Sequence, residues 1–273
     1  MSKKKITELQ QKAKEIRRDL TTLLYKAGSG HWGGSLGMAD VFSVLFFGNI
    51  LKYNPKKSDW KDRDRFILSN GHICPVYYTA LDHAGFFGDK KIKLRKLGSP
   101  LQGHPSHLHL DMIETSTGPL GQGVGVAVGK ALALKLRKQK PPKVFCITSD
   151  GEHEEGSTWE AISSAGKFKL DNLVFILDRN HLQISGSTED VANLGDIGAR
   201  YKNLGWEVFE VDGHSIAKIL KIFTQVKKRN HKPKLIIANT VMGKGVRFIE
   251  NDYHYHGKAP NEEEYERAME LLG

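Results

Sequence analysis

The sequence predicts an α/β protein with three layers, in which helices cover both faces of a mainly parallel sheet. Residues 144–148 and 173–177 are short apolar runs with the length and β-branched content of buried strands, and a helix-length segment separates them. A βαβ unit of this kind makes its two strands parallel in one sheet. Strands and helices alternate along the rest of the chain as well, so a single domain over residues 1–273 accounts for all the expected elements.

The other elements follow from hydrophobic periodicity and from the positions of glycine. An amphipathic helix is expected over residues 5–27, ending at Gly28, and a glycine-rich loop over residues 28–37. Further strands are expected at 65–68, 207–211 and 234–241. Further helices are expected at 38–47, 75–83, 121–138, 196–203, 215–228 and 262–272. Residues 98–118 and 242–260 show no clear period and are predicted to be loops.

Composition excludes several classes of protein. The chain has 39% hydrophobic and 26% charged residues, which is ordinary for a soluble protein. No apolar run approaches the roughly 18 residues of a membrane span. The basic N-terminus has no apolar core, so it is not a secretory signal. Cys74 and Cys146 lie far apart, which favours two buried thiols in a reducing cytoplasm over a disulfide.

The formal net charge of +10 suggests nucleic acid or anionic lipid as possible partners. However, the lysines are spread over predicted helix faces and are not gathered with interleaved aromatic residues. Solvated helix surfaces explain this distribution better. A basic surface would also attract phosphorylated small molecules or an acidic partner subunit, and nucleic-acid binding ranks last among the alternatives.

Polar residues follow both strands of the βαβ unit. Asp150 and Gly151 come after the first strand and Asn180 comes shortly after the second. Ligands of open α/β sheets gather at such strand ends, and a carboxylate with a carboxamide suits Mg²⁺ that also grips a phosphate. Gly151 would let the backbone approach that phosphate at a helix N-terminus. The alternative is that Asp150 caps a helix and Asn180 forms a turn.

Several histidines lie in predicted loops beside glycines, where contact with a ligand is more common than in a core. They are His31, His72, His104, His107, His109, His254 and His256. His104, His107 and His109 resemble a zinc cluster, but no cysteine is nearby and Pro105 shapes a turn. Hydrogen bonds from these histidines to phosphate or sugar hydroxyls are the favoured interpretation.

Four glutamates surround the start of the helix after Asp150: Glu152, Glu154, Glu155 and Glu160. Negative charge at the positive end of a helix dipole explains some of them. It explains Glu160 less well, because this residue lies at least one turn inside the predicted helix.

In its motifs the chain resembles transketolase. The matching segments follow the order and similar spacing of that family from residue 29 to about 260, and SNGH (69–72) and GPLGQG (118–123) are highly specific. They are Ser29-Gly30-His31, residues 37–40, residues 62–72, Gly103-His104-Pro105, residues 117–123, Asp150-Gly151, Asn180 and His256-Gly257. Asn180 follows Asp150 by thirty residues, as in the thiamine-diphosphate signature, although Ser149 replaces its first glycine.

The resemblance implies a thiamine-diphosphate-binding fold and a role for each matching residue. Asp150, the side chain of Asn180 and the carbonyl of Leu182 would hold Mg²⁺, or Ca²⁺ or Mn²⁺ in its place. The residues expected at the diphosphate are Gly151, His72 and His256, and those along the cofactor rings are Gly118, Pro119 and Leu120. The histidines expected to face the substrate hydroxyls are His31, His72, His104 and His256. Glu155 and Glu160 match acidic residues that the family buries at an interface, where like charges would perturb their pKa values.

The resemblance also predicts that another chain is needed. The family's activating glutamate and most of its substrate-phosphate ligands belong to a pyrimidine-binding domain and a C-terminal domain, and this sequence ends at Gly273. We therefore expect the N-terminal subunit of a split transketolase, in a heterotetramer with two such partners and acting on sugar phosphates. His31-Trp32-Gly33-Gly34 resembles the loop of deoxyxylulose-phosphate synthases, so a synthase-like subunit is an alternative. A non-catalytic cofactor-binding or scaffold module is another.

Overall fold

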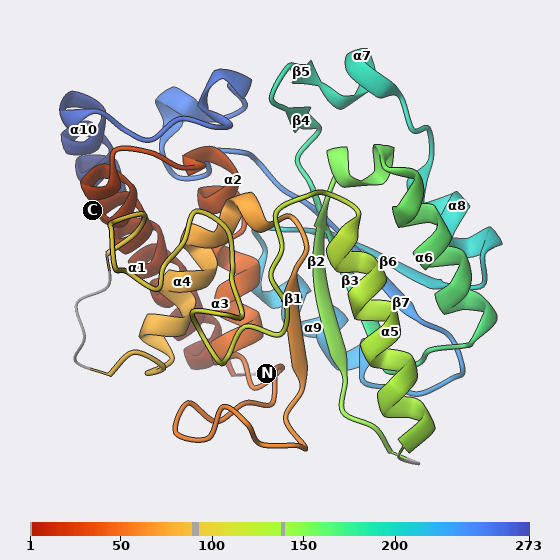
Figure 1. The fold of residues 1–273 in the computed structure, drawn as a ribbon. Helices are drawn as coiled ribbons and strands as arrows, with labels where there is room; N and C mark the ends of the chain where they lie inside the picture. Colours follow the sequence, from red (N-terminus) through yellow and green to blue (C-terminus); the bar gives the residue numbers. More distant parts are fainter. Residues whose placement is uncertain (1, 89–92, 138–139) are drawn as a thin grey trace.

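A five-stranded parallel sheet lies between two layers of helices (Figure 1), which confirms the predicted fold class. The computed structural model describes residues 2–88, 93–137 and 140–273. In spatial order the strands of the sheet are β1 (Arg65–Leu68), β2 (Val144–Ser149), β3 (Leu173–Arg179), β7 (Lys234–Asn239) and β6 (Glu207–Asp212). A small antiparallel hairpin, β4 (Leu182–Gln183) and β5 (Gly186–Ser187), lies apart from it.

The helices form two layers, each with its own hydrophobic cluster against one face of the sheet. One layer contains α1 (Lys3–Ala27), α2 (Trp32–Gly37), α3 (Ala39–Phe47), α4 (Cys74–His83), α9 (Ile216–Val226) and α10 (Glu262–Leu272). The other contains α5 (Gln122–Arg137), α6 (Gly156–Lys167) and α8 (Ile197–Asn203). The short helix α7 (Thr188–Ala192) follows the β4–β5 hairpin at the carboxyl end of the sheet (Figure 1).

The central strands are buried on both faces, as their continuous apolar sequences predict. All six residues of β2 are buried, as are the first six of β3. The parallel register pairs Ser149 with Asp178. It therefore places Asp150 and Arg179, the next residues of the two strand ends, beside each other. All five strands of the parallel sheet were predicted to within two residues. The helix at 262–272 begins and ends where the sequence placed it.

The prediction of a loop over residues 28–37 is wrong for its second part, because residues 32–37 form the helix α2. Periodicity did not reveal this helix, since its glycines have low helix propensity. The glycines are instead required by packing. A Cβ on Gly33 would lie 2.8 Å from Met242 Cγ, and one on Gly37 would lie 3.0 Å from the carbonyl oxygen of Val241. Trp32 anchors the helix: it is fully buried, and its indole N–H donates to Thr21 Oγ1 at 3.0 Å.

Two further segments differ from the predictions. No periodic signal in the sequence marks the β4–β5 hairpin or α7, and residues 242–260 contain the 3₁₀ turns Arg247–Ile249 and Tyr253–Tyr255. The helix expected at 121–138 is α5, and its predicted last residue, 138, lies outside the described residues. Across residues 2–88, 93–137 and 140–273, no helix combines the length and the apolarity that crossing a lipid bilayer requires.

Two helical glycines allow a matched test of the packing between α6 and the turn after α8. A Cβ on Gly166 would lie 1.8 Å from the carbonyl oxygen of Leu204, whereas a Cβ on Gly129 would meet no atom within 4 Å. We predict that Gly166→Ala lowers the free energy of unfolding by about 2 kcal/mol through overpacking. Gly129→Ala should instead raise it by up to about 1 kcal/mol, because alanine favours the helix. Urea denaturation of both variants measures these changes. Equal changes in the free energy of unfolding would contradict the close packing of Gly166 against Leu204.

Candidate functional site

A cleft of about 400 Å³ opens at the carboxyl end of the sheet. It lies where ligands of parallel α/β sheets bind. Its walls come from segments that are far apart in the sequence. The lining residues are His31, Gly34, His72, Ile73, His104, Leu120, Ser149, Gly151, Glu154, Glu155, Asp178, Asn180, Leu182, Gln183, Ile184, Ser185, Val191 and His256.

Three of the predicted histidines form a cluster in this cleft. The ring centroids of His31 and His72 are 4.9 Å apart, and His256 lies 5.6 Å from His31 and 5.3 Å from His72. His31 precedes α2, His72 lies in the 3₁₀ turn Gly71–Ile73, and His256 follows the turn at 253–255. His104 reaches the same cleft from the long loop after α4. The structure thus brings all four predicted histidines together.

Burial favours the neutral form of these histidines. It lowers the pKa of His31 to about 4, with smaller effects from the charges of His256, Arg95 and His104. Burial likewise lowers the pKa of His72 well below its ordinary value, and it lowers the pKa values of His104 and His256. At neutral pH each imidazole therefore has one N–H donor and one nitrogen acceptor.

Several buried polar atoms around the cleft have no hydrogen-bond partner within the described chain. They are His31 Nδ1, His256 Nδ1, Thr117 Oγ1, and both Asn70 Nδ2 and Asn70 Oδ1. A buried polar atom left unpaired costs about 1–3 kcal/mol. Because His31 and His256 line the cleft, their unpaired nitrogens are placed to form hydrogen bonds with a polar ligand there.

The other histidines that the sequence suggested do not join this cluster. His107 Nδ1 lies 2.9 Å from Ser116 Oγ, and His109 Nδ1 lies 2.9 Å from Ser106 Oγ. His254 is exposed and contacts Asp252. Among the described residues, no group of three or more His, Cys, Asp and Glu side chains is arranged to hold a metal ion. The zinc alternative for His104, His107 and His109 therefore finds no support in the geometry.

Arg95 is a cation near the cluster that the sequence reasoning missed. Its Nη2 donates to the carbonyl oxygen of Gly103 at 3.4 Å, next to His104. Its positive charge contributes to the lowered pKa values of His31 and His104. Only its place in a loop beside the predicted histidine segment could have indicated this, because a single arginine among many basic residues carries no pattern.

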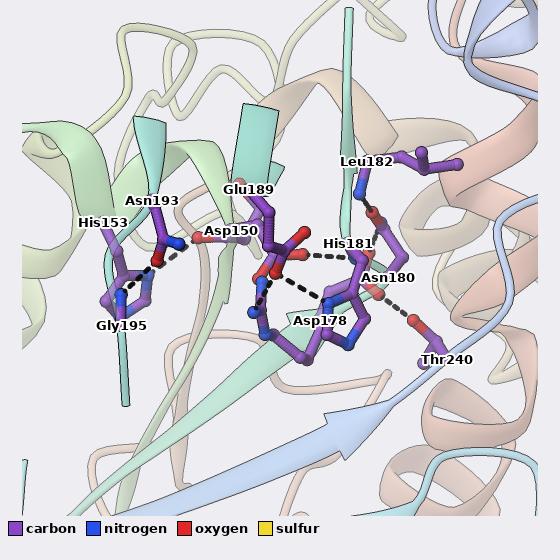
Figure 2. Close-up of polar contacts among 12 residues, drawn as sticks. Asp150, His153, Asp178, Asn180, His181, Leu182, Glu189, Asn193, Gly195 and Thr240 are labelled. Atoms are coloured by element: carbon purple, nitrogen blue, oxygen red, sulfur yellow. Dashed lines mark hydrogen bonds and ion pairs between the residues drawn. The ribbon is translucent and has the colours of Figure 1, made fainter. Parts of the chain in front are cut away.

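The two predicted metal ligands with side-chain oxygens are Asn180, which lines the cleft, and Asp150, which is buried between the lining residues Ser149 and Gly151 (Figure 2). Asp150 is 1% exposed, and its Oδ2 accepts from the backbone N–H of His181 at 2.7 Å. Its Oδ1 accepts from Arg179 Nη1 at 2.9 Å. Burial raises the pKa of Asp150, and Arg179 opposes that effect. Asn180 Oδ1 accepts from the backbone N–H of Leu182 at 2.9 Å.

The carboxylate of Asp178 holds the side-chain amide of Asn180 in place. Its Oδ2 accepts from Asn180 Nδ2 at 3.2 Å, and its Oδ1 accepts from Thr240 Oγ1 at 2.5 Å (Figure 2). Burial raises the pKa of Asp178 to about 7. Because Nδ2 is held by Asp178, the amide oxygen of Asn180 is oriented toward the turn that contains Leu182. Carboxylate, amide and backbone carbonyl oxygens are the donors that Mg²⁺, Ca²⁺ and Mn²⁺ favour, so these residues fit such an ion.

The loop predicted to lie along cofactor rings is fixed by glycine conformation and by a buried acid. Gly118 has φ +159°, and a Cβ there would lie 3.3 Å from the ring of His104. The backbone N–H of Gly121 donates to Glu152 Oε1 at 2.9 Å, and Ser69 Oγ donates to the same oxygen. Burial raises the pKa of Glu152 to about 7. Glu152 therefore joins the ends of β1 and β2 to this loop.

The acidic turn contains glutamates in different environments, which the sequence alone did not separate. Glu152 is fully buried, whereas Glu155 and Glu160, the two predicted interface residues, are exposed on this chain. Glu155 lines the cleft next to Gly121, where a Cβ would lie 2.9 Å from Glu155 Cβ. Glu160 lies on α6, outside the cleft.

Comparison with known proteins adds family information to this geometry. The profile of the family described as "Transketolase, thiamine diphosphate binding domain" matches residues 9–273. One of the subunits of the apulose-4-phosphate transketolase of Phocaeicola vulgatus is 38% identical over 265 residues, covering 97% of this chain and 93% of that protein. The 6-deoxy-6-sulfo-D-fructose transketolase subunit SqwG of Clostridium sp. is 36% identical over 273 residues, covering 100% and 98%.

Solved structures give the same result for the fold. The transketolase of Campylobacter jejuni superposes with a TM-score of 0.90 at 37% identity, covering 97% of this chain and 43% of that one. The transketolase of Leishmania mexicana also gives 0.90, at 31% identity, covering 97% and 41%. The chain therefore spans less than half the length of these solved structures.

His153, behind the acidic turn, allows a test of how burial controls histidine protonation. It is fully buried, its Nε2 lies 2.8 Å from Tyr201 Oη, and burial lowers its pKa to about 4. Between pH 6.5 and 4 the unfolded chain binds one more proton at this site, so stability falls as the pH falls through that window. We predict that in His153→Gln the free energy of unfolding depends less steeply on pH in this window, with a slope smaller by up to about 1.4 kcal/mol per pH unit.

Urea denaturation at pH 7, 6 and 5 measures that slope. The exposed His254→Gln is the control and should keep the slope of the unmodified chain. Parallel slopes for His153→Gln and the unmodified chain would mean that His153 is not held neutral.

Proposed function

The chain belongs to the transketolase family, as a thiamine-diphosphate-binding domain, and from this premise we propose that it forms the cofactor-binding half of a ketol-transferring enzyme. In this proposal residues 1–273 act as one domain. The assembled enzyme moves a two-carbon glycolaldehyde unit from a ketose phosphate to an aldose acceptor. The observation that carries the proposal is that a cluster of buried histidines and the side-chain oxygen of Asn180 share one cleft, with the buried carboxylate of Asp150 at the neighbouring strand end.

The cofactor, when bound, supplies the carbon nucleophile and the electron sink. In this proposal the divalent ion, Mg²⁺ or in its place Ca²⁺ or Mn²⁺, is held by Asp150, Asn180 and the carbonyl of Leu182. Gly151, His72 and His256 contact the diphosphate, and Gly118, Pro119 and Leu120 lie along the rings. The unpaired buried atoms of Asn70, Thr117, His31 and His256 support a polar ligand of this kind.

The four histidines bind and orient the sugar in this proposal. As neutral imidazoles, His31, His72, His104 and His256 can each donate one hydrogen bond and accept another at sugar hydroxyls. A neutral imidazole can also take up or release a proton at a hydroxyl oxygen. Low pKa values favour this role, because a charged cluster of rings about 5 Å apart would repel itself.

A second subunit is part of the proposal. Two relatives that this chain covers almost completely carry the word "subunit" in their names, whereas it covers less than half of the solved transketolases. We infer a partner with the pyrimidine-binding and C-terminal domains, in a heterotetramer of two chains of each kind. Glu155 and Glu160, exposed on this chain, would meet that partner or a second copy. Two buried free thiols, Cys74 and Cys146, agree with a cytoplasmic setting.

The synthase-like alternative rested on the His31-Trp32-Gly33-Gly34 loop. In the structure Trp32 is fully buried against Thr21 and does not line the cleft. Trp32 therefore contributes to the core beneath α2, whereas His31 and Gly34 of the same loop line the cleft. The relatives named above act, by their names, on an apulose phosphate and on a sulfofructose, so the sugar itself stays open within ketol transfer.

Removal of the metal ligands tests the cofactor site. We expect Asp150→Ala and Asn180→Ala to lower thiamine diphosphate binding at least tenfold in the presence of Mg²⁺, because each change removes one oxygen ligand. Isothermal titration of the chain with its partner subunit measures this. Asp59→Ala, which removes an exposed carboxylate in the loop before β1, is the matched control and should bind normally. Equal binding by all four proteins would rule out the proposed metal ligands.

Reconstitution tests the division of labour and the reaction. The chain alone, at micromolar concentration with thiamine diphosphate and Mg²⁺, should transfer ketol groups far below the rates of family enzymes. Addition of the pyrimidine-domain subunit should restore transfer from xylulose phosphate to an aldose phosphate. Pyruvate decarboxylation by the same mixture would favour a synthase-like enzyme, and full ketol transfer by the chain alone would disprove the split site.

A further inference from the structure

Arg179, at the end of β3, lies between two carboxylates. Its Nη1 donates to Asp150 Oδ1 at 2.9 Å, and its Nη2 donates to Glu189 Oε1 at 2.7 Å. The side chain of Arg179 is 16% exposed, that of Asp150 is 1% exposed and that of Glu189 is 43% exposed. The planar guanidinium fork can bond to two acceptors in a fixed geometry, which lysine cannot reproduce. Arg179 therefore joins a buried carboxylate at one strand end to a surface carboxylate on α7.

A second connection joins the same two carboxylates. The backbone N–H of His181 donates to Asp150 Oδ2 at 2.7 Å, and His181 Nδ1 lies 3.0 Å from Glu189 Oε1 (Figure 2). Both oxygens of Asp150 are thus held, one by Arg179 and the other by His181. Two contacts on different oxygens fix the rotation of the carboxylate as well as its position.

The segment that Glu189 belongs to exposes much of its apolar surface and is held largely by polar contacts, such as the 3.0 Å hydrogen bond from the backbone N–H of Thr188 to the carbonyl oxygen of His181. Residues 182–192, which comprise the β4–β5 hairpin and α7, form one wall of the cleft. Ile184 is 69% exposed and Val191 is 47% exposed, so little apolar burial holds this wall in place. Within the segment, Ser187 caps α7 by accepting from the backbone N–H of Asp190 at 3.1 Å. The contacts of Glu189 with Arg179 and His181 join the wall to the sheet.

The free lone pairs of Asp150 and the net charge of the group decide whether Arg179 assists a metal ion at Asp150 or competes with it. An ionised carboxylate has about four lone-pair sites. One protein donor contacts each oxygen of Asp150, so a lone pair remains on each for a metal ion. Asp150 and Glu189 carry two negative charges and Arg179 one positive charge, so the group still attracts a cation. The lone pairs and the charge both favour assistance.

We propose that Arg179 is a positioning residue for the divalent cation, and this rests on the metal site given under Proposed function. It holds the Asp150 carboxylate in a fixed orientation with free lone pairs. Through Glu189 it also fixes the 182–192 wall, which includes the ligand Leu182, to the same carboxylate. Arg179 therefore contributes both to binding of the cation and to order in this wall, alongside the contacts of His181.

Binding of Mn²⁺ to the full chain tests the proposal. Free Mn²⁺ is followed by electron paramagnetic resonance, in a buffer without chelating anions. We expect Arg179→Met to weaken Mn²⁺ binding by about 10- to 100-fold, the usual effect of removing a group that orients a metal ligand. Arg179→Lys should recover only part of the affinity, since an ammonium does not bridge two carboxylates as a guanidinium does. Arg200→Met, which removes an arginine stacked on Trp159, is the matched control and should bind normally.

Hydrogen exchange of the metal-free chain provides a readout that ligand loss alone would not change. Arg179→Met should speed exchange of the backbone amides in residues 182–192 and leave those of β2 and β3 unchanged. Glu189→Gln should also speed exchange in the wall, but it should weaken Mn²⁺ binding less than Arg179→Met because Asp150 keeps its guanidinium.

The outcomes separate this inference from the proposed function. If Asp150→Asn keeps the Mn²⁺ affinity of the unmodified chain, or if the unmodified chain shows no saturable binding, the metal site itself is wrong. If Asp150→Asn abolishes binding while Arg179→Met binds within twofold of the unmodified chain, only the positioning role is wrong. Tighter binding by Arg179→Met would overturn it too, since Arg179 would then be a competing cation.

Discussion

The parallel register between β2 and β3 is the constraint on which the cleft depends. It pairs Ser149 with Asp178, and so brings the two strand ends that follow into contact. Both strands are buried on both faces, and a shift of one residue would turn every side chain to the opposite face. The hydrophobic core therefore fixes the position of Asp150 relative to Asn180, although neither residue contributes apolar packing. In this sense the geometry of the polar site is set by the apolar residues beneath it.

A buried polar site of this kind costs stability, and the protein offsets this cost differently at the strand ends and at the histidine cluster. At the strand ends, Asp150, Asp178 and Asn180 satisfy one another or receive backbone and arginine donors. At the histidine end, buried atoms of His31 and His256 stay without a partner in the described chain, and burial keeps the rings neutral. The first end is preorganised by the protein. The second is arranged so that a ligand completes its hydrogen bonds, which is where binding energy can be gained.

The sequence predicted the sheet well because buried parallel strands leave an unmistakable apolar pattern. The residues at the strand ends and the four histidines were predicted as candidates, since loop polar residues beside glycines are unusual in a core. The sequence failed where tertiary packing overrides local preference. Residues 32–37 form a helix because Gly33 and Gly37 pack against the 241–242 backbone and side chains, and no periodicity reports such a contact. Glu152 could not be told from Glu155, because only the fold buries one and exposes the other.

The edges of the cleft favour a second chain on physical grounds. Ile184 and Val191 expose apolar surface beside the proposed cofactor position, and Glu155 brings a carboxylate to the same rim. Where the cleft is open to water, hydrogen bonds between neutral histidines and a sugar only replace hydrogen bonds that both groups make to solvent. They therefore contribute little net binding energy. A covering subunit would remove that water and lower the local dielectric, which strengthens each polar contact inside. It would also add anchors for the 182–192 wall, which in this chain is attached by polar contacts such as those of Glu189 with Arg179 and His181. Closure by a partner and order at the metal ligands would then reinforce each other.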